Sequence, residues 1–98
     1  MASIKVDDFV VTRLLYETGQ QKQTFKYFLA QILSTRGTKV ECSFLRRQGR
    51  DRNSFHFPTI SDVLEADVSQ IMSVVRCTSR RGYYSLCPNH TRFLPLLQ

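Results

Sequence analysis

Residues 27–47 read YFLAQILSTRGTKVECSFLRR, in which two largely apolar runs flank a short polar stretch. Within each run the side chains alternate with a period of two, as they do in half-buried β-strands. Every second residue of each run falls on one face: Phe28, Ala30, Ile32, Val40, Cys42 and Phe44. Residues 34–38 supply the turn, where Gly37 can take a positive φ at little cost. The stretch therefore predicts a β-hairpin around which the rest of the chain is organised.

Three further segments have the β-branched and aromatic composition of strands. They are FVVTRLLY at 9–16, FHF at 55–57 and IMSVV at 71–75. The first segment is largely apolar on both faces, which is typical of strands in small barrels. Pro58 ends the second, because proline cannot donate a ladder hydrogen bond. With Ser61 as the cap of a single 3₁₀ turn, the chain is expected to form five strands and one brief helical turn.

Two polar, glycine-containing stretches, at 17–24 and 48–54, predict loops. Beyond residue 75 the chain is first basic and then apolar, with a candidate extra strand at 83–87. Pro88 and Pro95 interrupt any regular structure after that strand. The apolar end is therefore expected to dock on the rest of the chain or on a partner.

Length and composition limit the number of domains. A chain of 98 residues with 42% hydrophobic content suits one compact domain and is too short for two separate ones. We expect a barrel over residues 1–75 and an extension over residues 76–98. No apolar run approaches the roughly 20 residues that span a bilayer, and the N-terminus lacks the apolar core of a secretory signal. A soluble intracellular protein without membrane association is expected.

Three cysteines, Cys42, Cys77 and Cys87, form an odd set that predicts free thiols in a reducing compartment. Together with His90 they are candidate zinc ligands, although only Cys87 and His90 have the short spacing of a ligand pair. Cys42 fits the interior of the hairpin better. Neither histidine of the chain is accompanied by the glycine-rich elbow or the acid of a nucleophilic site. We expect no metal, no cofactor and no catalytic residues.

The formal charge of +6 is unevenly distributed, since residues 35–56 are strongly basic and residues 57–75 contain acids and no base. The basic residues along the hairpin and the loop after it are Arg36, Lys39, Arg46, Arg47, Arg50 and Arg52. We call residues 46–52 the arginine loop. Clustered guanidinium groups attract phosphates or acidic segments, so these six residues predict a basic stripe that binds nucleic acid with little sequence specificity. The alternative is a solvated loop that maintains solubility.

The segments DDFVV, YFLAQIL, CSFLRR and FHFP, with their spacing to Ile71 and the RRGYY that follows, resemble the strand order of small SH3-like barrels of the Tudor type. More narrowly, they resemble a short domain of transposon-associated and chromatin-associated animal proteins. The resemblance covers about residues 7–86. It implies a five-stranded, strongly bent antiparallel barrel without catalytic machinery, in a nuclear protein.

Tudor-like domains often capture methylated lysine or arginine in a cage of aromatic faces. Carried over position by position, the resemblance implies a cage at Leu14 or Tyr16, Tyr27, Phe44 and the loop from Arg46 onward. The candidate cage members in this chain are Tyr16, Tyr27 and Phe57. The arginine loop stands where a further ring is expected, and its charge repels a methylammonium group. Ordinary packing of these rings in the barrel is the alternative.

We therefore expect a non-catalytic adaptor that binds a protein or peptide, either by adding a strand to an exposed sheet edge or in a groove of the barrel. The acidic segment at 61–67 and the apolar end at 93–97 offer two surfaces for such a partner. Direct binding of DNA or RNA by the arginine loop is the alternative function. Recognition of methylated lysine or arginine is a third.

Overall fold

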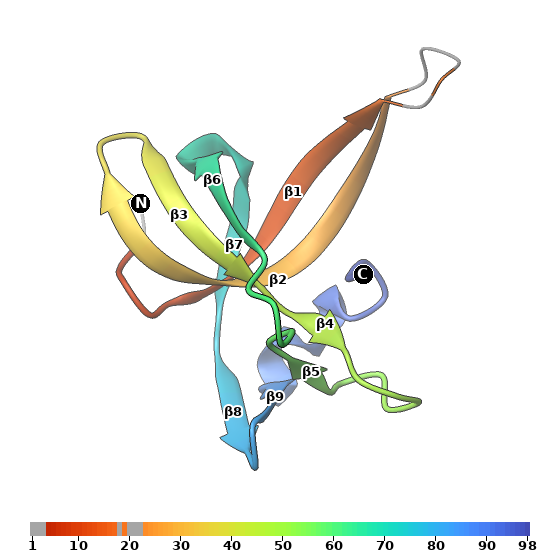
Figure 1. Ribbon diagram of the computed structural model, residues 1–98. Helices are drawn as coiled ribbons and strands as arrows, with labels where there is room; N and C mark the ends of the chain where they lie inside the picture. Colours follow the sequence, from red (N-terminus) through yellow and green to blue (C-terminus); the bar gives the residue numbers. More distant parts are fainter. Residues whose placement is uncertain (1–3, 18, 20–22) are drawn as a thin grey trace.

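The computed structural model describes residues 4–17, 19 and 23–98. This part of the chain contains nine β-strands in two sheets and two 3₁₀ helices (Figure 1). The strands of the first sheet are β1 (Phe9–Glu17), β2 (Gln23–Arg36), β3 (Lys39–Phe44), β6 (Val63–Asp67) and β7 (Ile71–Val75). The strands of the second sheet are β4 (Arg46–Arg47), β5 (Phe55–His56), β8 (Cys77–Arg80) and β9 (Tyr83–Leu86). The 3₁₀ helices are η1 (Val68–Gln70) and η2 (Pro88–Phe93).

The first sheet contains the predicted hairpin, formed by β2 and β3. Arg36 pairs with Lys39, so Gly37 and Thr38 alone make the turn. Gly37 has a φ of +60°, a conformation that a residue with a Cβ rarely adopts. The hairpin prediction is confirmed, and residues 34–36, expected in the turn, belong to β2 instead.

The expected all-β class with antiparallel sheets is confirmed. The strand order of the first sheet is β6-β3-β2-β1-β7, and that of the second is β4-β5-β9-β8. Helix η1 connects β6 to β7, the two edges of the first sheet, but these strands are not paired with each other in the described chain. Neither sheet therefore closes on itself. The first sheet is strongly curved, and β3 and β7 lead directly into β4 and β8 of the second sheet (Figure 1).

The expectation of five strands with a 3₁₀ turn at Ser61 is wrong in both respects. Residues 63–67 form β6, because each of them pairs with a residue of β3. The turn is instead η1, where Asp67 accepts a hydrogen bond from the Ser69 amide at 3.0 Å and the Gln70 side chain accepts one from the Asp67 amide at 2.8 Å. This reciprocal capping box fixes the start of the turn.

Strands β8 and β9 form a second tight hairpin. Only β9 corresponds to a segment that the sequence pattern indicated, the candidate strand at 83–87. The turn consists of Arg81 and Gly82, with φ values of 53° and 83°. Positive φ at both central positions is the geometry that matches the twist of hairpin strands, and a glycine supplies one of the two positions.

Strands β1 and β2 are buried on both faces at residues 10–12 and 29–30, because these residues lie between two cores. The adjacent residues Val10 and Val11 are both fully buried, and they belong to different cores. The buried residues of the first core, which the bent first sheet encloses, are Val10, Ala30, Ile32, Val40, Cys42, Phe44 and Ala66. Those of the second core, beside the second sheet, are Val11, Leu29, Leu45, Phe55, Val75, Leu86 and Leu97. The apolar character of both faces thus has a structural cause at residues 9–12, whereas Leu15 and Tyr16 are exposed.

The C-terminal residues pack on the second core. Residues 94–97, which we call the C-terminal turn, include the buried Leu97. Leu97 forms a β-bridge with Tyr27, and the amide of Gln98 donates to the Tyr27 carbonyl at 2.9 Å. Residues 76–98 therefore share a core with the central strands β1 and β2.

Beyond the first core, residues 13–17 of β1 and 23–27 of β2 continue as a two-stranded ribbon (Figure 1). In the loop expected at 17–24, residues 17, 23 and 24 belong to these strands, and residues 18 and 20–22 lie outside the described residues. The ribbon carries three exposed apolar side chains, Leu15, Tyr16 and Phe25.

Replacing Ile32 with alanine removes a fully buried side chain from the first core. We expect the free energy of unfolding to fall by about 2–5 kcal/mol, because the lost methyl groups leave a cavity. Urea denaturation followed by circular dichroism measures the change. The matched control is Val63→Ala in β6, where the side chain is exposed and a change below about 0.5 kcal/mol is expected. Equal effects of the two substitutions would contradict the assignment of Ile32 to the core.

Candidate functional site

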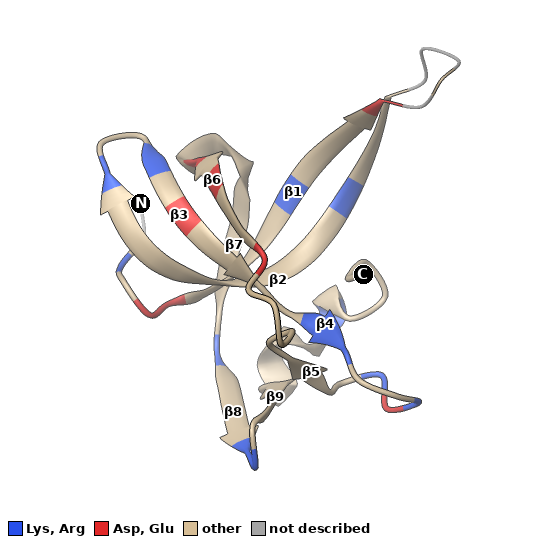
Figure 2. Cartoon of the chain, viewed as in Figure 1, with Lys and Arg blue, Asp and Glu red and all other residues tan. Residues whose placement is uncertain are grey.

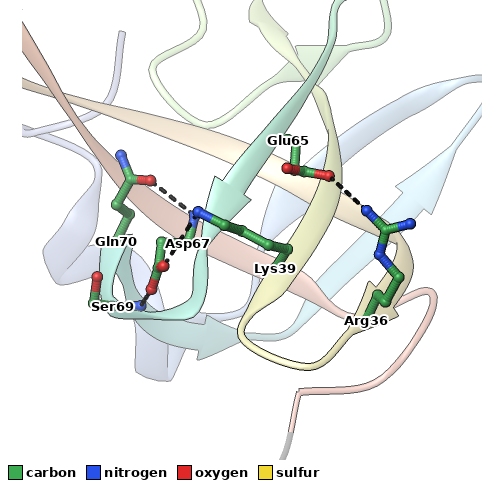
Figure 3. Close-up of polar contacts among 6 residues, drawn as sticks. All are labelled: Arg36, Lys39, Glu65, Asp67, Ser69 and Gln70. Carbon is green, nitrogen blue, oxygen red and sulfur yellow. Dashed lines mark hydrogen bonds and ion pairs between the residues drawn. The ribbon is translucent and has the colours of Figure 1, made fainter.

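The basic and acidic runs of the sequence are brought together by the pairing of neighbouring strands. Three ion pairs connect them: Arg36–Glu65 at 3.8 Å, Lys39–Asp67 at 3.4 Å and Arg46–Asp62. The first two lie side by side across β2, β3 and β6 (Figure 3). Exposed pairs of this kind contribute only about 0–1 kcal/mol each to stability. Their main consequence is that half of the predicted binding residues face acids of the same chain.

Asp67 has two roles at this edge of the sheet. Its pKa is lowered from the ordinary aspartate value, first by hydrogen bonds from Ser69 and further by Lys39. The side chain is therefore ionised at neutral pH, where it both caps η1 and holds the ammonium group of Lys39 (Figure 3).

Arg47 is a structural residue. Its guanidinium group donates to the carbonyls of Leu94 and Arg52, and to that of Leu97 at 3.0 and 3.2 Å. The group also lies 5.2 Å from the centre of the Phe55 ring. A planar guanidinium can satisfy several carbonyls at once, because it carries five N–H donors. Arg47 thus fastens the C-terminal turn to the second core.

Arg50 and Arg52 are exposed on the loop between β4 and β5. With Leu94 of the C-terminal turn they line a shallow pocket of about 400 Å³. Asn53 anchors the loop, since its side chain donates to the Leu86 carbonyl at 3.0 Å and accepts from the Leu86 amide at 2.7 Å. Two guanidinium groups are therefore presented to solvent on an anchored loop.

The six predicted binding residues do not form one stripe. Arg36 and Lys39 flank the hairpin turn at one end of the first sheet, whereas the arginine loop lies beside the second sheet (Figure 2). They form two separate groups, Arg36 with Lys39 and Arg47 with Arg50 and Arg52. In the second group, Arg47 is bound to backbone carbonyls.

Residues 45–58 and 76–98 build the second sheet and the C-terminal turn, and we call them the basic half. They contain eight arginines, no lysine and one aspartate, which gives a net charge of +7. The remainder of the chain has six basic and seven acidic residues, a net charge of −1. The excess of positive charge thus belongs to the basic half (Figure 2).

Four arginines of the basic half were missed as candidate site residues: Arg76, Arg80, Arg81 and Arg92. The available signal was the absence of any acidic residue from residues 76–98. That signal is weaker than the clustering of the arginine loop, because these four positions are spread over 17 residues.

The three candidate cage residues do not converge on one surface. Tyr16 lies on the ribbon, where the ammonium group of Lys26 is 4.8 Å from the centre of its ring. Tyr27 is on the opposite face of the ribbon. It pairs with Arg13, which lies three residues before Tyr16 in β1, and residues an odd number of positions apart in a strand point to opposite faces. Tyr27 and Phe57 both pack against the second core, and Phe57 meets Tyr84 edge-on at 5.3 Å.

The cysteines are separated in the same way. Cys42 is buried in the first core, whereas Cys77 packs against the second. Burial raises the pKa of Cys42 to about 11; burial and the neighbouring Cys87 raise the pKa of Cys77 to about 12. Both thiols are therefore protonated and weakly reactive at neutral pH. Among the described residues, no three His, Cys, Asp or Glu side chains are arranged to hold a metal ion.

Comparisons of the chain with protein-family models, with curated proteins and with solved structures give no match. No helix in the described part of the chain is long and apolar enough to cross a membrane. The function is therefore inferred from the residues of the chain itself.

Replacing Arg47 with lysine is expected to lower the free energy of unfolding by about 1–3 kcal/mol, because a single ammonium group leaves part-buried carbonyls without a donor. Urea denaturation measures the loss, and carboxypeptidase digestion reports release of the C-terminal turn. The control is Arg50→Lys, on the exposed loop, with an expected change within about 0.5 kcal/mol. Equal stability of the two variants would show that Arg47 does not fasten the turn.

Proposed function

We propose that the protein is a non-catalytic module that binds nucleic acid through its phosphate groups, using the basic half. The supporting observation is the charge of +7 on that half, in contrast to the remainder, where Arg36 and Lys39 are paired with acids. Guanidinium groups match the geometry of phosphate oxygens. An array of them binds a polyanion with release of condensed counterions.

The exposed arginines are distributed along the second sheet. Arg50 and Arg52 lie on the loop before β5, while Arg80 and Arg81 lie at the turn before β9. Because β5 and β9 are antiparallel, these two basic segments are at opposite ends of the sheet. Such an arrangement suits an extended polyanion better than a single small anion.

The fold supports this proposal through the resemblance to SH3-like and Tudor-like barrels, some of which contact DNA or RNA. The first sheet has five antiparallel strands in the order β6-β3-β2-β1-β7, with a 3₁₀ turn before the last strand. Membership in that barrel class is part of the proposal. A nuclear setting, linked to chromatin or to transposons, rests on the same resemblance and is proposed with it.

Two charge-matched variants test the location of the site. The first is Arg50→Gln/Arg52→Gln/Arg80→Gln/Arg81→Gln, and the second is Arg13→Gln/Lys26→Gln/Arg36→Gln/Lys39→Gln. Each removes four positive charges and leaves a formal charge of +2. Fluorescence polarisation with labelled oligonucleotides is expected to show a loss of about 100-fold or more in affinity at low salt for the first variant, and of about threefold or less for the second.

The dependence of affinity on salt is the second observable in this experiment. The slope of log affinity against log salt is expected to flatten in the first variant by about 0.7 for each lost phosphate contact with single-stranded DNA. Equal losses in the two variants would contradict a site in the basic half. No binding by the native protein at low salt would refute the proposed function.

The peptide-binding adaptor expected from the sequence is a second candidate, favoured by β7, whose outer edge pairs with no other strand of the described residues. Strand β6, the other edge of the first sheet, carries Glu65 and Asp67, and charged side chains protect edges from further pairing. Strand β7 has the sequence IMSVV and no charge. An extended peptide with apolar side chains at alternate positions is the partner that such an edge accepts.

A groove beside β7 supports this second candidate. It measures about 340 Å³, and its lining is mainly apolar: Ile4, Val68, Ile71, Met72 and Val74, with Ser69 and Ser73. Met72 sits at an irregularity in the pairing with β1, and its side chain is 47% exposed. The groove thus lies where alternate side chains of an added strand would pack.

Met72→Lys is expected to abolish peptide binding at β7, because it places a charge in the apolar groove and protects the edge. The matched control is Val63→Lys on β6, where binding should be retained. Shifts of the β7 amides in ¹⁵N–¹H correlation spectra, recorded with a panel of extended apolar peptides, measure binding. If the β7 amides of the native protein do not shift with any peptide, the edge is not a docking site.

A further inference from the structure

The register of the second sheet places two arginines and two aromatic rings in one row. Arg46 of β4 pairs with His56 of β5, and Arg80 of β8 pairs with Tyr83 of β9. The rings of His56 and Tyr83 are in contact, with centroids 6.4 Å apart and an edge-to-face arrangement. The row Arg46–His56–Tyr83–Arg80 therefore crosses all four strands of the sheet on one face.

This row lies on the outer face, away from the second core. The residues next to its two rings, Phe55 and Tyr84, pair with each other and pack against the core. Since neighbouring residues of a strand point to opposite faces, His56 and Tyr83 point outward. Tyr83 is 42% exposed, and His56 is partly exposed.

The fold fixes the backbone positions from which the two rings project. His56 Nδ1 lies 3.2 Å from the Phe57 carbonyl oxygen, and Tyr83 directly follows the tight turn at Arg81 and Gly82. At one end of the row, the guanidinium group of Arg46 is held by Asp62. At the other end, Arg80 is exposed beside Arg81. Two stackable rings are thus flanked by arginines.

We propose that the outer face of the second sheet binds single-stranded nucleic acid, with unpaired bases stacked on Tyr83 and His56 and phosphates on Arg80 and Arg81. This inference rests on the proposed nucleic-acid function and names its ligand class. Aromatic rings between basic side chains are the recurrent means of binding single strands, because every base has a face that can stack. A duplex cannot use the rings in this way, since its bases already stack on each other.

The ribbon does not offer an equivalent surface. Its exposed rings, Tyr16 and Phe25, are covered by cations of the chain itself, with Lys26 4.8 Å from the first ring and Arg13 4.5 Å from the second. Tyr16 is nevertheless similar to Tyr83 in exposure, at 40% against 42%. It therefore provides a matched control that lies outside the basic half.

The test compares Tyr83→Ala, Tyr83→Phe and Tyr16→Ala by fluorescence polarisation with labelled oligo(dT) of about 15 nucleotides and with a DNA duplex of the same length. Tyr83→Ala is expected to weaken binding of oligo(dT) about 10-fold or more and to leave duplex binding unchanged. Tyr83→Phe, which keeps the ring, and Tyr16→Ala should bind oligo(dT) as the native protein does. Urea denaturation of each variant verifies that the fold is intact.

The outcomes separate this inference from the proposed function. If the variant without Arg50, Arg52, Arg80 and Arg81 loses binding while Tyr83→Ala does not, phosphate binding stands and the stacking surface is refuted. Equal weakening of single-stranded and duplex DNA by Tyr83→Ala would also refute it. Binding of polyglutamate as tightly as oligo(dT) would assign the surface to acidic peptides instead. No binding of any oligonucleotide at low salt would remove both proposals.

Discussion

Burial of the central strands on both faces is the constraint on which the rest of the structure depends. Val10 and Val11 are adjacent and fully buried on opposite sides of β1, so each side needs its own cover. The first sheet covers one side by bending over it. The second sheet and the C-terminal turn cover the other. An apolar strand face must pack on another layer, which is why the chain continues past β7 into β8 and β9.

The cover of the second core has little regular hydrogen bonding of its own. Strands β4 and β5 contain two residues each, and the C-terminal turn meets the sheets through one β-bridge. Side chains supply the missing connections. Arg47 donates to carbonyls of the C-terminal turn, and Asn53 bonds to both backbone groups of Leu86. Polar residues of β4 and of the loop between β4 and β5 therefore act as structural links as well as surface groups.

Local patterns in the sequence predict the parts of the fold that local interactions determine. The alternation along residues 27–47 and the glycine at position 37 were sufficient for the β2–β3 hairpin. Strand β6 was not predictable, because VLEAD becomes a strand only by pairing with β3, and CTSR in β8 likewise depends on β9. The same limit applies to the site. Arg46 and Arg47 look equivalent in the sequence, yet one pairs with Asp62 and the other is bound to carbonyls.

The location of free charge on the surface is therefore a property of the fold. Clustering of basic residues along the sequence marked Arg36 and Lys39 as candidate binding residues. Their acidic partners, Glu65 and Asp67, are nearly 30 residues away in sequence and lie beside them because β6 pairs with β3. The charge that remains is on the second sheet, where residues 76–98 contribute arginines and no acid. In the same sheet, Phe55 and Tyr84 point inward to the second core. Because neighbouring residues of a strand point to opposite faces, His56 and Tyr83 point outward. Burying one face of this sheet in the second core thus creates the basic and aromatic surface on the other.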